Sequence, residues 1–146
     1  MKLAVAFLAG VLVAIGMSGR ADNWLTGTVR SYHLERRDYE ESNLGLGVET
    51  DVSQRMRIAL GFYRNSERRD SFYGAAVYCP ISTRYQNWRI CGLAGGVTGY
   101  NEAIAPLAGA VLSYESREWG ANLLILPNKR GDFMAGVVAL QLKHRW

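Results

Sequence analysis

The sequence predicts an all-β protein: an eight-stranded antiparallel up-and-down transmembrane β-barrel at residues 22–146, preceded by a signal peptide at residues 1–21. Three observations predict it: period-two alternation along the chain, aromatic residues near the ends of the alternating segments, and a chain that ends on an aromatic residue. The length of 146 residues fits one domain, and 49% hydrophobic residues exclude a disordered chain. Sixteen glycines against three prolines are unusual for helices and suit closely packed strands.

The first 21 residues have the pattern of a secretory signal peptide. Lys2 gives the positive start, Leu3–Met17 is an uncharged apolar run of fifteen residues, and Gly19 and Ala21 are small residues before a cleavage site. A membrane-spanning helix needs about 20 apolar residues, so a retained anchor is the less favoured alternative. Cleavage lowers the formal charge from +4 to +2, because two basic residues and no acids are lost. Nucleic acid is therefore not indicated as a partner.

The first three alternating segments are Trp24–Leu34, Leu44–Asp51 and Met56–Arg64. The third is the clearest, with large apolar side chains at every second position. In the first, strict alternation places Arg30 on the same face as Trp24.

Five more alternating segments complete the set, and eight strands of about 8–11 residues make the smallest common barrel. The five are Ser71–Cys79, Trp88–Val97, Pro106–Tyr114, Gly120–Pro127 and Phe133–Trp146. With both termini at one end of the barrel, every second connection lies at the other end. These connections are Glu35–Asn43, Asn65–Asp70, Thr98–Ala105 and Asn128–Asp132.

Alternation alone does not distinguish a soluble barrel, apolar inside, from a membrane barrel, apolar outside. The aromatic residues near strand ends favour the membrane, because they match interfacial girdles. The final strand ends on Trp146 and resembles the terminal strand of bacterial outer-membrane barrels, which implies recognition by the barrel-assembly machinery. We therefore expect a monomer in the outer membrane of a Gram-negative cell. The alternative is a soluble lipid-binding barrel.

The two cysteines, Cys79 and Cys91, flank the fourth connection almost symmetrically. Export permits a disulfide across that hairpin, if the Cα atoms lie about 4.4–6.8 Å apart. Two free, small core residues are the equal alternative. With two histidines and no Cys-x-x-Cys pattern, no metal or organic cofactor is implied.

Candidate functional residues lie at the end away from the termini. His33 ends the first strand, and Asn65 and Ser66 begin the connection after the third. A histidine beside a serine suggests a base that removes a hydroxyl proton during acyl transfer. The alternative is a histidine and a serine that only contact water. Arginines in the same connections suit lipopolysaccharide phosphates, although a solvated, charge-balanced rim is the simpler interpretation.

Several segments, in a shared order, resemble the lipid A palmitoyltransferases of the Gram-negative outer membrane. The resemblance covers roughly Tyr32 to Trp146. The segments are Tyr32-His33, Asp38–Gly47, Phe62-Tyr63-Arg64-Asn65-Ser66, Gly92–Thr98, Pro106-Leu107-Ala108, Leu126-Pro127 and Trp146. The resemblance implies an eight-stranded barrel that moves an acyl chain from a phospholipid to lipid A, so that both lipids are partners.

By motif, the family's catalytic histidine, aspartate and serine correspond to His33, Asn65 and Ser66, so the aspartate is an amide here. An amide orients a neutral histidine but does not stabilise an imidazolium as a carboxylate does. The chain also lacks the family's amphipathic N-terminal helix. The resemblance implies that Ser66 and His33 react, Asn65 orients them, and a glycine-lined interior holds the acyl chain. The alternative is a non-enzymatic barrel for membrane integrity or surface recognition, in which Asn65 marks lost chemistry.

Overall fold

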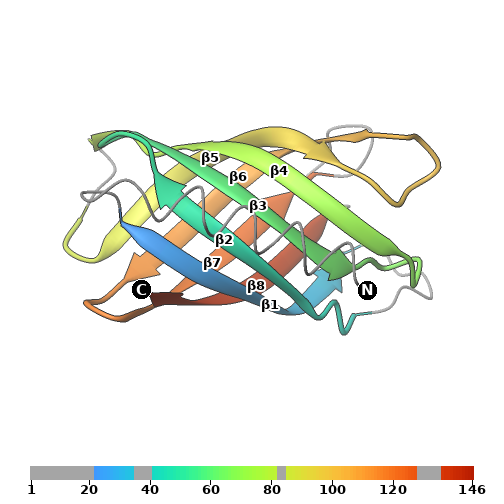
Figure 1. Cartoon of the computed structure of the whole chain (residues 1–146), viewed down its shortest axis with the longest axis horizontal. Coiled ribbons are helices and arrows are strands. Elements are labelled where there is room, and N and C mark those ends of the chain that lie inside the picture. The colour runs from blue at the N-terminus through green and yellow to red at the C-terminus, as the bar shows by residue number, and fades with distance from the viewer. Residues whose placement is uncertain (1–21, 35–40, 82–84, 128–135) are drawn as a thin grey trace.

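The computed structural model describes residues 22–34, 41–81, 85–127 and 136–146. The predicted signal peptide at 1–21 lies outside them, as do residues 35–40, 82–84 and 128–135 of the connections. The described chain forms one closed barrel in which each strand pairs antiparallel with its neighbours and the first pairs with the last (Figure 1). The predicted all-β, eight-stranded, up-and-down barrel is confirmed. Among the described residues, no helix has the length and apolar character needed to cross a bilayer.

The strand bounds agree closely with the alternating segments, except at the last strand. The strands are β1 (Asn23–His33), β2 (Gly45–Asp51), β3 (Met56–Arg64), β4 (Asp70–Tyr78), β5 (Trp88–Val97), β6 (Ala105–Glu115), β7 (Trp119–Leu126) and β8 (Val137–Arg145). The predicted eighth strand began at Phe133, which lies outside the described residues, and β8 begins later, at Val137. β7 ends at Leu126, because Pro127 has no N–H for the ladder, and the β7–β8 register ends there at Leu126↔Val137.

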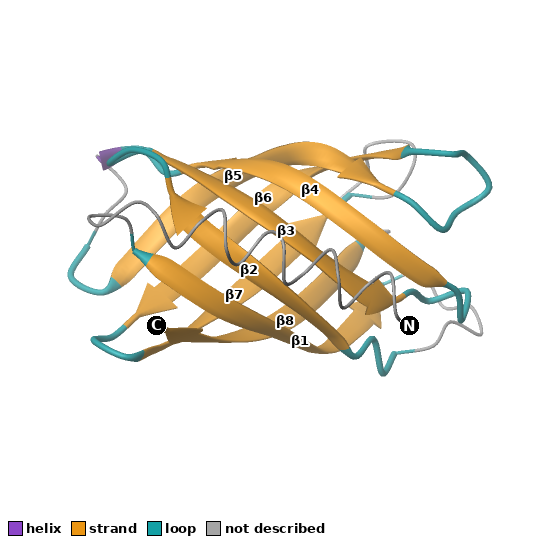
Figure 2. Cartoon of the chain, viewed as in Figure 1, coloured by secondary structure: helices purple, strands orange, loops and turns teal. Residues whose placement is uncertain are grey.

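The candidate functional residues lie at the end of the barrel opposite the start of β1 and the end of β8. The N–H of Trp146 donates to the carbonyl of Asn23 (3.2 Å), so the start of β1 and the end of β8 lie at one end of the barrel, the termini end (Figure 1). Figure 2 shows the strands running between this end and the opposite one. The connections after β1, β3, β5 and β7 lie at the opposite end, the loop end. His33, Asn65 and Ser66 therefore belong to the loop end, as predicted.

The outer face of the barrel is largely apolar. Aliphatic side chains that point outward and are exposed include Leu25, Leu46, Ile58, Ile90, Leu140 and Leu142. Exposed aromatic side chains gather near strand ends. They include Tyr32 and Phe72 toward the loop end, and Tyr78, Trp88, Tyr114, Trp119 and Trp146 toward the termini end.

The inner face contains an apolar cluster and a disulfide. The buried members of the cluster are Ala59, Ala75, Val77, Cys79, Cys91, Leu93 and Val111. Cys79 and Cys91 lie next to the Tyr78↔Gly92 pair, on its turn side in the β4–β5 hairpin, and are joined by a disulfide. Their Cα atoms are 4.2 Å apart, slightly below the range expected from the sequence. Of the two alternatives that the sequence leaves open, the structure has the disulfide.

Candidate functional site

A β-bulge in β1 decides which way the candidate histidine points. Thr28 pairs with Gln141 and Arg30 pairs with Leu140, so Val29 is an extra residue in the ladder. Alternation therefore reverses after Thr28. The prediction that Arg30 shares the face of Trp24 is wrong, because Arg30 is exposed outside while Trp24 is buried inside. The bulge turns Ser31 and His33 inward, whereas strict alternation would have pointed both outward.

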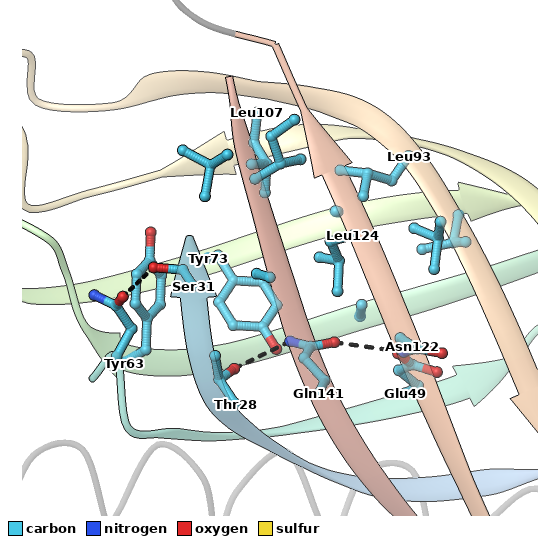
Figure 3. Close-up of a pocket in the computed structure, with 18 of the residues that line it drawn as sticks. Thr28, Ser31, Glu49, Tyr63, Tyr73, Leu93, Leu107, Asn122, Leu124 and Gln141 are labelled. Atoms are coloured by element: carbon cyan, nitrogen blue, oxygen red, sulfur yellow. Dashed lines mark hydrogen bonds between the residues drawn. The ribbon is translucent and has the colours of Figure 1, made fainter. Parts of the chain in front are cut away.

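The inward side chains enclose a pocket of about 140 Å³. One water molecule needs roughly 10–15 Å³ on the same measure, so the pocket has room for a chain of several methylene groups. Apolar residues of β3 to β7 form much of the wall. Figure 3 shows Leu93, Leu107 and Leu124 together, apart from a polar row of Thr28, Gln141, Asn122 and Glu49.

A charged network crosses the barrel below this pocket, toward the termini end. Arg57 contacts Asp51 (2.5 Å), Glu49 (3.0 Å) and Glu115 (2.5 Å). Lys143 contacts Glu115 (2.6 Å) and Glu49 (3.3 Å), and its side chain is fully buried.

Further polar contacts complete this ionic floor, which we define as Glu49, Asp51, Arg57, Arg89, Glu115 and Lys143. Arg89 lies 3.2 Å from Glu115, Lys143 donates to the hydroxyl of Ser113 (2.8 Å), and Asn122 donates to Glu49 (2.5 Å). Three acids balance three bases, so the floor closes the polar end of the pocket without net charge. The sequence carries a partial signal for it, since five members occupy inward positions of alternating segments and Glu115 directly follows the segment Pro106–Tyr114. Alternation does not pair residues across a barrel.

Polar side chains surround the pocket near the loop end. Ser31 donates to the amide oxygen of Asn43, and the amide nitrogen of Asn43 donates to the carbonyl of Arg64 (2.9 Å). The hydroxyls of Tyr63 and Tyr100 lie 3.1 Å apart, which joins the wall to the β5–β6 connection. We call this part of the pocket, with Ser31, His33, Tyr63, Ser66 and Tyr100, the mouth.

The predicted reactive pair lies in one pocket. His33, from the inward end of β1, and Ser66, from the β3–β4 connection, both line it, and both are half-buried. These two residues come from elements that are not neighbours in the barrel. The pocket therefore combines an apolar wall with a base and a hydroxyl at its mouth.

Asn65 is fully buried, and its side chain forms hydrogen bonds within the connections at the loop end. Its side-chain oxygen accepts from the N–H groups of Glu67 and Arg69, each at 2.9 Å. Its amide nitrogen donates to the hydroxyl of Ser71 and to the carbonyl of Gly99, each at 2.9 Å. These four hydrogen bonds use both donors and both acceptor positions of the amide, and none of them is to His33.

The described ladder between β6 and β7 covers only part of β6. The β6–β7 register runs from Glu115↔Gly120 only as far as Ala110↔Ile125, although β6 continues to Ala105 and pairs there with Val97 of β5. Within the described residues, positions 105–109 of β6 thus have a ladder partner on the β5 side alone. Leu107, which lines the pocket, lies in this stretch.

In the part of the chain that the structure describes, no three His, Cys, Asp or Glu side chains are grouped so that they could hold a metal ion.

Comparison of the chain with known protein families and with curated proteins finds no match. The fold and the pocket therefore define the class: a closed eight-stranded antiparallel barrel with an interior apolar pocket and an ionic floor. The resemblance to lipid A palmitoyltransferases stays a prediction.

Proposed function

We propose that this protein is an outer-membrane acyltransferase that takes an acyl chain into its interior pocket and transfers it from a phospholipid to lipid A. One observation carries the proposal: His33 and Ser66 line the mouth of a pocket whose wall is largely apolar. Apolar walls suit a hydrocarbon chain, and a base and a hydroxyl that line one pocket suit acyl transfer. The two features occur in one pocket.

The outer surface supports a membrane location. Exposed Leu and Ile side chains cover the strands, while charged groups form the ionic floor inside. A soluble barrel has the reverse arrangement. Exposed aromatic residues toward both ends match two interfacial girdles.

The chemistry is acyl transfer through Ser66. His33 takes the hydroxyl proton while the oxygen of Ser66 attacks the phospholipid ester carbonyl. A carbon–oxygen bond to Ser66 forms, the ester bond breaks, and the lysophospholipid leaves with the proton from His33. A lipid A hydroxyl then attacks the acyl-serine, its proton passes through His33, and the Ser66 hydroxyl is restored.

The route of the acyl chain from the bilayer to the pocket is assigned to the wall between β6 and β7, which Pro106 and Pro127 flank. Backbone ladders normally keep a barrel wall closed to lipid, since unpaired N–H and C=O groups are costly in hydrocarbon. Pro106 in β6 and Pro127 after β7 have no N–H to leave unsatisfied. An opening beside Leu107 therefore costs less than it would elsewhere in the wall.

Mass spectrometry of lipid A tests the proposal. The full-length protein is expressed in a Gram-negative host, with an empty vector and Ser66→Ala as controls. We expect a lipid A species heavier by one acyl chain with the wild type and with neither control. Heat-modifiable gel migration confirms that each variant is folded in the membrane fraction. Folded wild type without the heavier species would refute acyl transfer to lipid A.

A second candidate is a non-enzymatic barrel that stabilises the outer membrane. The engagement of Asn65 favours it, because all four hydrogen bonds of the side chain serve the loops. This candidate predicts folded protein, no modified lipid A, and a host membrane that resists detergent better than the empty-vector control.

A further inference from the structure

We propose that Asn65 is a positioning residue whose amide joins the β3–β4 connection to the β5–β6 connection and so sets the mouth of the pocket. The proposal rests on the proposed function, because it assigns Asn65 an effect on Ser66 and Tyr100 at the mouth. It assigns no contact with the reacting atoms.

The acceptor half of the Asn65 side chain shapes the turn that carries Ser66. The side-chain oxygen holds the N–H groups of Glu67 and Arg69. The backbone closes the same turn, since Asn65 donates to the carbonyl of Arg69 (2.8 Å) and Arg68 donates to the carbonyl of Asn65 (2.9 Å). Ser66 lies inside this turn, so its position at the pocket depends on it.

The donor half fixes the neighbouring connection. The amide nitrogen donates to the carbonyl of Gly99, which has φ of +87°. A Cβ at Gly99 would lie 2.4 Å from the hydroxyl oxygen of Ser71 and 2.6 Å from the carbonyl of Asp70. The Gly99 backbone is thus packed directly against the Asn65 site, and a side chain there would push the connections apart.

Tyr100 connects this contact to the pocket. It follows Gly99, lines the pocket, and pairs with Tyr63 through the two hydroxyls. One amide therefore holds the turn that carries Ser66 through its oxygen, and the carbonyl of Gly99, which precedes Tyr100, through its nitrogen.

This arrangement needs an amide rather than an acid. A carboxylate could still accept from Glu67 and Arg69, but it has no hydrogen to donate to the Gly99 carbonyl and would set two oxygens against each other. The amide at position 65, where the resemblance implies an aspartate, is thus explained by the contact between the two connections.

The test separates the two halves of the side chain. Full-length protein, processed by the host and purified in micelles, is compared by ¹H–¹⁵N NMR as wild type, Asn65→Asp and Asn65→Ala. Asn101→Asp is the matched control, because it adds the same charge to the β5–β6 connection and keeps an oxygen acceptor for Arg69.

We expect Asn65→Asp to keep amide exchange at Glu67 and Arg69 within about threefold of wild type, and to shift or broaden the signals of Gly99 and Tyr100. Asn65→Ala should also accelerate exchange at Glu67 and Arg69 by about tenfold or more, because the acceptor is lost as well. Asn101→Asp should leave the four hydrogen bonds of Asn65 intact.

The lipid A assay gives the second measurement. Asn65→Asp and Asn65→Ala should lower acylation by about tenfold or more, with Asn101→Asp unchanged. Wild-type signals at Gly99 and Tyr100 in Asn65→Asp would overturn the proposal, as would a rise in acylation in that variant. An inactive wild type would refute only the proposed function, because the NMR comparison would still decide whether Asn65 positions the two connections.

Discussion

Arg57 of β3 and Glu115 at the end of β6 meet across the barrel interior, with Nη1 of Arg57 2.5 Å from Oε1 of Glu115. β3 and β6 are not neighbouring strands in the barrel. Lys143 of β8 contacts the same carboxylate oxygen at 2.6 Å. Glu115 thus pairs with two buried cations from two other strands and links them within the ionic floor.

Removal of this carboxylate should destabilise the barrel strongly. Glu115→Ala leaves Arg57 and Lys143 buried with less compensation, and breaking a buried pair costs about 3–5 kcal/mol. We expect a loss of this size in the free energy of unfolding, measured by denaturant titration in lipid vesicles. Glu67→Ala is the control, because it breaks the exposed Arg69–Glu67 pair, which should be worth less than about 1 kcal/mol. Equal losses in both variants would contradict the role of the floor.

Under the proposed function, a larger side chain in the pocket should shorten the acyl chain that is transferred. Ala75→Leu fills part of the pocket from β4, and each methylene that no longer fits should lower transfer about tenfold or more. Lipid A mass spectrometry measures the distribution of transferred chain lengths. Ala94→Leu makes the same change at an exposed, outward position of β5 and should leave the distribution as in the wild type. An unchanged distribution in Ala75→Leu would show that the chain does not bind there.

The disulfide should contribute measurably to stability. Its cysteines are twelve residues apart, and closing a loop of that size contributes about 2–3 kcal/mol. The double variant Cys79→Ala, Cys91→Ala should therefore unfold at lower denaturant concentration than the wild type. Reductant should shift the wild type in the same direction and leave the double variant unmoved. Rapid labelling of the unfolded, non-reduced wild type with a thiol reagent would mean that the bond is absent.

Two single-residue deletions test the bulge in β1. Deletion of Val29 removes the extra residue and should keep His33 inward, whereas deletion of Tyr32 should turn it outward. Each deletion is combined with His33→Cys and labelled in vesicles with a lipid-soluble thiol reagent. We expect rapid labelling only in the Tyr32 deletion. Similar labelling in both would contradict the assigned register.

Local pattern predicted the strands well, because alternation reports the two faces of each strand directly. The order of the strands also predicted that His33 and Ser66 lie at the loop end, because successive connections of an up-and-down barrel alternate between its two ends. Alternation failed at Val29, because a bulge adds one residue without a distinct sequence signal and reverses the faces beyond it.

The sequence by itself determined the number of strands, their approximate bounds and the end of the barrel at which His33 and Ser66 lie. Only the tertiary structure decided that Glu115 meets Arg57 and Lys143, that Cys79 is bonded to Cys91, and that Asn65 serves two connections. The physical reason is that side-chain alternation is a property of one strand, whereas these contacts depend on register between strands and on closure of the barrel.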